Sequence, residues 1–372
     1  MDVQALTQKA IDELVASGRE TGLQVAAYLD GRPVVNACAG LADARTGVPV
    51  DERTLFHGWS AGKGLTATAV HVLAEKGLLD YDAPVAEYWP EFGAHGKTGI
   101  TLAHVLTHSA GVPQAPAGTT VEDLGDWHTM CARIAGSRPL WEPGTATGYH
   151  ALTFGYILGE VVRRVGRPIR QVLREEVAAP LGVEDDLHFG VPAEHLARVA
   201  RMEDGNWPEA LASRPRGSLF FQAAPDAVQA RAELGNRPDY LVLDVPCAGT
   251  MTALGLARMY AALVGEVDGV RLISAERAAE VATVVTADTD RVLGAPIPKG
   301  LGYFLGLPEM GPEIGAFGCK GSGGAIAFAD PRSRFSFALT HNRLTAPPAD
   351  NAAWIARRVR EALGIGEGAH AR

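Results

Sequence analysis

Hydrophobic positions along the chain follow helical spacing in some stretches and strand-like runs in others. Apolar residues recur at helical spacing over 3–17, and two short apolar runs at 23–29 and 34–39 flank the pair Asp30-Gly31. An Asp-Gly pair between two apolar runs predicts a β-hairpin. Helical periodicity predicts further helices, which cover 61–82, 101–108, 152–165, 251–265 and 349–363.

Strand character returns late in the chain, at 302–306, 324–329 and 335–340. Strands at both ends around a helical middle predict one antiparallel sheet flanked by helices, with a helical domain inserted between the strands. The expected fold class is therefore α/β plus an all-α lobe. We expect an α/β sandwich domain formed by 1–58 and 296–372, and a mainly helical domain formed by 59–295.

One stretch of the expected helical domain, 185–245, differs in composition. It is rich in Pro, Gly, Arg and Asp and contains isolated aromatic residues. This pattern is typical of loops, which either form a mobile cap over a site or make a plain excursion over the surface.

Composition narrows the class of protein. The 372 residues are 47% hydrophobic and 21% charged, which is enough apolar material for a sizeable core. The net charge of -9 excludes nucleic acid and anionic membrane surfaces as main partners, because both require clustered basic residues. No apolar run reaches the roughly 20 residues that a membrane span needs. The first residues lack the basic and apolar regions of a secretory signal, so a cytoplasmic location is expected.

The cysteines indicate neither a disulfide framework nor a metal site. Four are present, and they lie far apart without Cys-x-x-Cys or Cys/His spacing: Cys38, Cys131, Cys247 and Cys319. No metal and no cofactor are expected.

The most informative segment surrounds Ser60. Lys63 follows three residues later, and this is the chain's single Ser-x-x-Lys pair. If a helix begins near Ser60, both side chains lie on one face, and a neutral amine there can take the hydroxyl proton and activate the serine as a nucleophile. The alternative is an N-cap serine followed by a solvated lysine.

The same serine also lies in a Gly-x-Ser-x-Gly sequence, Gly58 to Gly62, which is the nucleophile elbow of α/β-hydrolases. That interpretation requires a later acidic residue and a later histidine. It also requires alternating strands and helices ahead of the serine, for which the preceding 59 residues leave little room. The Ser-Lys interpretation is favoured.

Four segments occur in an order and at a spacing that resemble the serine β-lactamase-like superfamily, in the branch of class C β-lactamases, family VIII carboxylesterases and transesterases. They are 56–63, 100–112, 142–149 and 317–324, and the resemblance extends from about 20 to 362. It implies a β-lactamase/transpeptidase-like fold with the serine at a helix N-terminus between the two lobes. It also implies that His104 and His108 are packing or hydrogen-bonding residues.

The resemblance implies roles for individual residues. Ser60 corresponds to the acylated nucleophile, Lys63 to its proton acceptor, and Tyr149 to the tyrosine that shares the proton and passes it to the leaving group. The backbone N–H groups of Ser60 and Ser322 correspond to the oxyanion hole. The strand triplet Cys319, Lys320 and Gly321 corresponds to the substrate-binding Lys-Thr-Gly motif.

The chain departs from the class C pattern in two places. Tyr149-His150-Ala151 lacks the asparagine of Tyr-x-Asn, and Cys319 stands where lysine or histidine is usual. Lys320 either compensates as an anion or proton partner or points to solvent. A literal Lys97-Thr98-Gly99 precedes Tyr149 in what is expected to be a polar turn ahead of a helix, and it is not the motif.

These departures make efficient β-lactam hydrolysis doubtful. The expected function is a serine hydrolase that forms an acyl-enzyme on Ser60, most simply a carboxylesterase acting on small esters. The alternative is an acyltransferase that passes the acyl group to an alcohol or amine, and weak β-lactamase activity is a third interpretation. The expected partner is a small-molecule ester or acyl donor, and the sequence does not indicate an oligomeric state.

Overall fold

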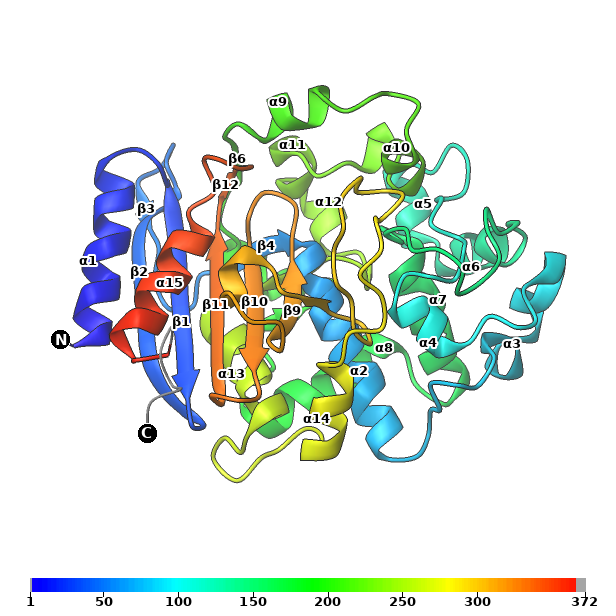
Figure 1. The fold of residues 1–372 in the computed structure, drawn as a ribbon. Coiled ribbons are helices and arrows are strands. Elements are labelled where there is room, and N and C mark those ends of the chain that lie inside the picture. Colours follow the sequence, from blue (N-terminus) through cyan, green and yellow to red (C-terminus); the bar gives the residue numbers. More distant parts are fainter. Residues whose placement is uncertain (1, 366–372) are drawn as a thin grey trace.

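A seven-stranded antiparallel sheet forms the frame of the computed structural model, which describes residues 2–365 (Figure 1). The two ends of the chain meet in its middle, where β1 pairs with β11 and Val25 lies opposite Leu339. This confirms the predicted sheet built from both ends of the chain. In spatial order the strands are β3 (Val48–Pro49), β2 (Arg32–Asp43), β1 (Gly22–Leu29), β11 (Phe335–His341), β10 (Ile326–Asp330), β9 (Phe317–Lys320) and β8 (Phe304–Leu305).

The predicted hairpin is confirmed in β1 and β2. Asp30 and Gly31 both have positive φ angles, 51° and 75°. Two successive residues with positive φ make a turn whose twist matches that of the flanking strands, and Asp-Gly is a favoured pair for it.

The two faces of the sheet pack against different helices because side chains alternate along each strand. Val25 and Phe337 face α1 (Val3–Ala16) and α15 (Ala352–Ala362), which pack against one face. On the other face alanines such as Ala26 and Ala338 meet α13 (Ala253–Val264). The small side chains on this face let the helix lie close to the sheet.

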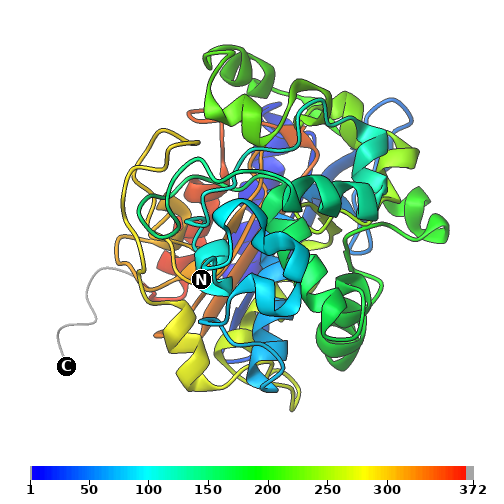
Figure 2. The same cartoon turned by 90° about the vertical axis from the view of Figure 1, so that its right-hand side faces the viewer.

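A helical region lies beside the sheet (Figure 2). At its centre is α2 (Lys63–Glu75), where every residue except Glu75 is buried. The helix ends at Glu75, earlier than the predicted 82, and Gly77 follows with a left-handed φ of 70°. Around it lie α3 (Val85–Tyr88), α4 (Leu102–Leu106), α5 (Val121–Gly125), α6 (Trp127–Ala135), α7 (Thr153–Arg164), α8 (Ile169–Val172) and α14 (Ala275–Val281).

Two small sheets join segments that are distant in sequence. One contains β4 (Phe56–Trp59), β7 (Gly249–Met251) and β5 (Leu187–His188), with β7 in the middle. The other pairs β12 (Arg343–Leu344) with β6 (Glu203–Asp204) in parallel. The first sheet fixes the strand that leads directly into Ser60.

The stretch 185–245 contains more regular structure than the predicted loops. It forms four short helices: α9 (Trp207–Ala212), α10 (Leu219–Ala223), α11 (Ala232–Gly235) and α12 (Pro238–Leu241). Ala223, Leu234 and Tyr240 are buried. Each helix spans six residues or fewer, which is too short for a clear period of hydrophobic positions. That this stretch is a mobile cap stays a hypothesis.

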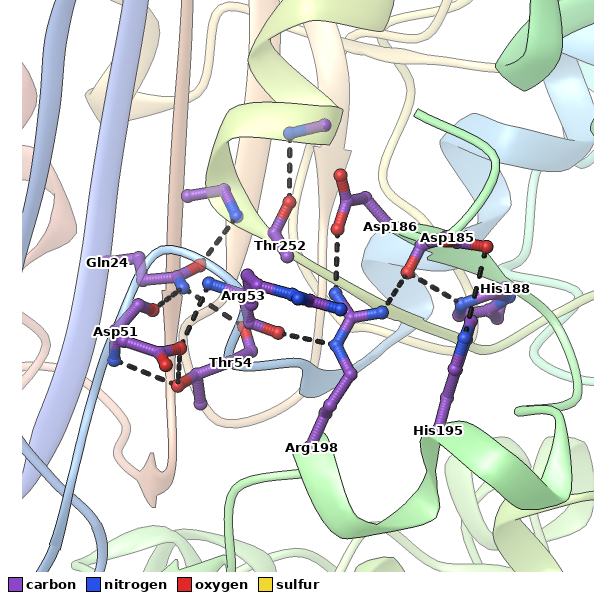
Figure 3. A network of polar contacts seen from close by, with 12 residues as sticks. Gln24, Asp51, Arg53, Thr54, Asp185, Asp186, His188, His195, Arg198 and Thr252 are labelled. Atoms are coloured by element: carbon purple, nitrogen blue, oxygen red, sulfur yellow. Dashed lines mark hydrogen bonds and ion pairs between the residues drawn. The ribbon is translucent and has the colours of Figure 1, made fainter. Parts of the chain in front are cut away.

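A polar network connects the sheet to the first part of the stretch 185–245 (Figure 3). Arg198 donates to the Arg53 carbonyl oxygen at 2.9 Å, to the Asp185 carbonyl oxygen at 2.7 Å and to Asp186 Oδ1 at 2.9 Å. From β1, Gln24 donates to the carbonyl oxygen of Asp51 at 2.7 Å and accepts from the Ala253 N–H at 2.9 Å. Strand β1, the loop before β4 and the start of α13 are thereby held together.

The division into two domains at 58 and 296 stays a prediction, as does the cytoplasmic location. Helix α13 comes from the expected helical domain and packs against β1, β10 and β11 of the sheet. Across residues 2–365, no helix has the length and apolar character that crossing a membrane demands.

Candidate active site

Ser60 occupies the junction between β4 and the helix that follows. It opens a short 3₁₀ turn, Ser60–Gly62, which runs directly into α2. The residue before it, Trp59, has φ 48° and ψ -128°, a conformation that costs a non-glycine residue free energy. Its indole stacks on Tyr240 with ring centroids 5.9 Å apart, so packing holds this sharp turn and the serine that it presents.

Lys63 is brought against Ser60, as the spacing predicts. Its Nζ lies 3.1 Å from Ser60 Oγ and 3.1 Å from the carbonyl oxygen of Cys247, to which it donates. The side chain is buried, with 2% of its surface exposed. This excludes the alternative of a solvated lysine beside an N-cap serine. The contact of Lys63 with Cys247 could not be predicted from sequence, because nothing in the surroundings of Cys247 signals an interaction with a residue 184 positions earlier.

Tyr149 is the third predicted catalytic residue, and it lies beside Ser60 and Lys63. It lies shortly before α7, and the centroid of its ring is 4.8 Å from Lys63 Nζ. Burial raises the pKa of its hydroxyl, while the Lys63 charge and contacts with Ser60 and Lys63 act in the opposite direction. The tyrosine is therefore held protonated beside the serine and the amine.

Gly321 permits the close approach of β9 to this junction. A Cβ atom at Gly321 would lie 2.0 Å from the carbonyl oxygen of Gly58, so only glycine fits. The next residue, Ser322, lines the same cavity as Ser60. Two segments distant in sequence thus bring the two predicted oxyanion donors to one site.

Cys319 and Lys320 point to opposite sides of β9. Cys319 lines a small cavity together with Ser60, Lys63 and Tyr149, and burial raises the pKa of its thiol to about 12. Lys320 lies on the other side and pairs with Glu309 and Asp350. Burial acts to lower the pKa of Lys320, but these two carboxylates outweigh it and raise the pKa. Lys320 is therefore neither directed at Ser60 nor extended freely into solvent, because it is held by these two carboxylates.

Lys97 of the literal Lys97-Thr98-Gly99 is buried, not solvated as the expected polar turn implies. Its Nζ donates to the carbonyl oxygens of Ala94 at 2.8 Å, Ala135 at 2.8 Å and Ser137 at 2.5 Å. Burial lowers its pKa to about 8. Lys97 joins its own turn to the C-terminal end of α6. It lines neither cavity at Ser60.

The nucleophile-elbow interpretation needs a later histidine beside Ser60, and four candidates, His150, His188, His195 and His341, lie away from the serine. His150 Nδ1 donates to the Gly148 carbonyl oxygen at 2.7 Å, its Nε2 accepts from the Val112 N–H at 3.1 Å, and burial lowers its pKa to about 4. His341 pairs with Glu20. Within the described residues, none of His150, His188, His195 and His341 lines either cavity at Ser60.

The predicted packing roles of His104 and His108 agree with their contacts. His104 Nδ1 accepts from the Thr101 N–H at 3.1 Å and so takes part in the cap of α4. His108 Nδ1 accepts from the His150 N–H at 3.1 Å, and its ring lies 4.8 Å from that of Tyr149.

The larger cavity at Ser60 is partly open to solvent, and among the residues that the structure describes no charged side chain lines its wall. A mainly apolar wall with a few polar groups is typical of a small-molecule site. Its polar groups include Ser60, Tyr149, Gln229 and Ser322, and the remainder is mainly apolar. The stretch 185–245 contributes Phe220, Ala224, Val228, Gln229, Ala230, Tyr240 and Val245.

In the part of the chain that the structure describes, no group of three or more His, Cys, Asp or Glu residues is arranged to hold a metal ion.

Comparison with known proteins agrees with this fold. The Beta-lactamase family model matches residues 7–362, and the chain belongs to this family. It is an enzyme, a serine hydrolase of the β-lactamase-like class.

Similar proteins include an enzyme named for two activities. "Esterase/beta-lactamase LipL" of Mycobacterium tuberculosis (strain ATCC 25618 / H37Rv) is 40% identical over 366 residues, covering 92% of this chain and 82% of LipL. The crystal structure of a family VIII carboxylesterase superposes with a TM-score of 0.87 at 34% identity, covering 96% of this chain and 98% of that one. A penicillin-binding protein homologue from Caulobacter crescentus gives a TM-score of 0.85 at 32% identity, covering 97% and 98%.

Proposed function

We propose that the protein is a carboxylesterase that forms an acyl-enzyme on Ser60 from small, uncharged carboxylic esters. The observation that carries this proposal is the 3.1 Å contact between Lys63 Nζ and Ser60 Oγ in a buried site. A lysine amine in hydrogen-bond reach of a serine hydroxyl can take its proton when the amine is neutral.

In the first half-reaction Ser60 Oγ attacks the ester carbonyl carbon, and its proton passes to Lys63. The carbonyl oxygen becomes an oxyanion between the backbone N–H groups of Ser60 and Ser322. The bond from carbonyl carbon to leaving-group oxygen then breaks, while Tyr149 donates its proton to the departing alcohol and takes the proton held by Lys63. In the second half-reaction water loses a proton to Lys63 and attacks the acyl carbon. The bond to Ser60 Oγ breaks, the acid leaves, and Ser60 Oγ takes the proton back.

The wall of the larger cavity supports esters over β-lactams. The β-lactam antibiotics carry a carboxylate, and burying an unpaired charge is unfavourable. Within residues 2–365 no arginine or lysine lines the larger cavity, and Cys319 occupies the motif position of a lysine. The name of LipL joins esterase and β-lactamase, which supports testing both substrates.

Intact-mass analysis tests the proposal. The protein is incubated with 4-nitrophenyl esters of increasing acyl length and with β-lactams, beside Ser60→Ala. We expect the ester acyl mass to add once to the wild type and not to Ser60→Ala, with little β-lactam adduct. Acylation of Ser60→Ala, or acylation by β-lactams alone, would contradict the proposal.

The fate of the acyl group separates hydrolysis from acyl transfer. The rate at which the added mass disappears is compared with and without a small alcohol. A carboxylesterase loses the acyl group at the same rate with and without the alcohol, and the product is the free acid. Loss that depends on the alcohol, with a new ester as product, would identify an acyltransferase.

A further inference from the structure

A buried ion pair lies directly behind Tyr149, in a segment without any sequence motif. The carboxylate of Asp290 and the amine of Lys299 are 3.1 Å apart, with side-chain exposures of 0% and 1%. Neither residue lines the cavities at Ser60, so neither touches the substrate's position.

Asp290 is bonded to the backbone of the tyrosine itself. Its Oδ1 accepts the N–H of Tyr149 at 3.0 Å. The same oxygen accepts the N–H groups of Val292 at 2.9 Å and Leu293 at 2.8 Å. Its other oxygen faces Lys299. One carboxylate therefore joins a turn of its own segment to the backbone of Tyr149.

A second backbone contact fixes the same two segments. The Arg291 N–H donates to the Thr147 carbonyl oxygen at 2.9 Å. Val292 packs with Tyr149 and Phe304 in one small apolar cluster and also lines the larger cavity. The turn that begins at Asp290 thus fixes the position of the Tyr149 backbone and the position of Val292 in the wall of the larger cavity.

We infer that Asp290, paired with Lys299, is a positioning residue that holds the Tyr149 hydroxyl in register with Ser60 and Lys63. This inference rests on the proposed function. A buried carboxylate without a cationic partner is strongly unfavourable, and Lys299 is that partner at 3.1 Å. A carboxylate paired in this way is a stronger acceptor for the three N–H groups than a neutral acceptor would be.

The test combines Asp290 variants with removal of the Tyr149 hydroxyl. Asp290→Asn keeps the side chain's shape and removes its charge, and Asp290→Asn with Lys299→Met removes both charges in case the single variant does not fold. The matched control is Glu160→Gln, because Glu160 is a buried carboxylate paired with Arg164 on α7 and lines neither cavity. Turnover of a 4-nitrophenyl ester is measured with the wild-type tyrosine and with Tyr149→Phe.

We expect the Asp290 substitution to lower kcat by about tenfold to a hundredfold with KM nearly unchanged, since misplacement of a catalytic group by 1 Å can have such an effect. In the Tyr149→Phe background the same substitution should change kcat by less than about threefold, because the hydroxyl is already absent. Glu160→Gln should leave kcat unchanged in both backgrounds.

Equal losses of kcat in the two backgrounds would overturn the positioning role, because an effect that bypasses Tyr149 is independent of its hydroxyl. A wild-type kcat in the Asp290 variants would do so as well. Failure of the proposed function gives a different result, since Ser60→Ala would then still acquire the acyl mass whatever residue stands at 290.

Discussion

Lys63 Nζ lies over the ring of Tyr149, 4.8 Å from the ring centroid. This places the amine against the face of the aromatic ring while its other contacts are Ser60 Oγ and the Cys247 carbonyl oxygen. Once the amine has taken the serine proton it is a cation, which is favourable over a tyrosine face, and the ring alone supplies that interaction. The tyrosine ring therefore contributes to the contact with Lys63, and the hydroxyl contributes to proton transfer. A substitution can remove the hydroxyl and keep the ring.

Tyr149→Phe keeps the ring beneath Lys63 and removes only the hydroxyl. If that hydroxyl passes the proton to the leaving group, kcat should fall by about 10²–10⁴, the usual contribution of a general acid or base. The melting temperature should change little, because the packing against Phe304 and His108 is retained. Steady-state kinetics on 4-nitrophenyl esters and a thermal melt provide the measurement.

His341→Gln and His188→Asn serve as controls for that experiment. In the nucleophile-elbow interpretation, a later histidine would take the serine proton and one of these variants would be inactive. A kcat of Tyr149→Phe within about threefold of wild type, together with an inactive histidine variant, would reverse the choice of mechanism.

The frame of the fold and the Ser60–Lys63 contact could be predicted from sequence because both depend on local spacing. Alternation along 23–29 and 335–340 sets which face of each strand packs, and three residues along a helical turn bring Lys63 back to Ser60. Chain order also indicated that strands from both ends share one sheet.

Features that depend on distant segments could not be predicted in this way. Lys97 is buried because carbonyl oxygens from 94, 135 and 137 converge on it, and no local pattern records that. The contact of Asp290 with Tyr149 spans 141 residues of sequence. The pairing of Lys320 with Glu309 and Asp350 likewise depends on the way that three segments meet.

Gly321→Ala tests the close approach that brings Ser322 to the site. A new Cβ would lie 2.0 Å from the Gly58 carbonyl oxygen and 3.1 Å from the Ala61 nitrogen, so backbone must shift. We expect kcat to fall by about 10²–10³, as for loss of one oxyanion donor. Overpacking should also lower the free energy of unfolding by about 1–3 kcal/mol.

Gly99→Ala is the matched control for Gly321→Ala, because a Cβ at Gly99 would meet no atom within 4 Å. It should leave both kcat and the free energy of unfolding near wild type. If Gly321→Ala lowers stability but keeps full kcat, the assignment of the Ser322 N–H to the oxyanion hole is wrong.

The two thiols nearest to Lys63 should be unreactive in the folded protein. Burial raises the pKa of Cys319 to about 12 and also raises that of Cys247, so both remain thiols at neutral pH. The thiolate is the reactive form, so iodoacetamide at about pH 8 should label neither and should leave esterase turnover intact. Peptide mass mapping before and after unfolding in urea measures this, and labelling of Cys319 in the folded protein would contradict it.

Cys38 is the internal reference for that labelling. It is only partly buried, although burial and nearby carboxylates raise the pKa of its thiol as well. It should therefore be labelled before the two buried thiols, which react only once the chain unfolds.

The buried pair of His341 and Glu20 should make stability depend on pH above neutrality. Their Nδ1 and Oε2 atoms are 2.9 Å apart, with side-chain exposures of 3% and 1%. Burial acts to lower the pKa of His341, but the charge and hydrogen bond of Glu20 outweigh it and raise the pKa above 6.5. The folded state then binds this proton more tightly than the unfolded state does. The contribution of the pair is complete below the unfolded pKa of about 6.5 and is lost as pH rises through the folded pKa.

His341→Gln removes this titration, so its free-energy difference from wild type should be largest near pH 6 and should shrink toward pH 9, about the range that spans both pKa values. Urea unfolding across that range measures the difference. A pH-independent difference for His341→Gln would show that the pair does not hold its proton more tightly in the folded state.

For His150→Asn, the free-energy difference from wild type should depend on pH in the opposite direction and below neutrality, because burial lowers the pKa of His150 to about 4. The contribution of the neutral histidine is present above about pH 6.5 and is lost as pH falls through the folded pKa.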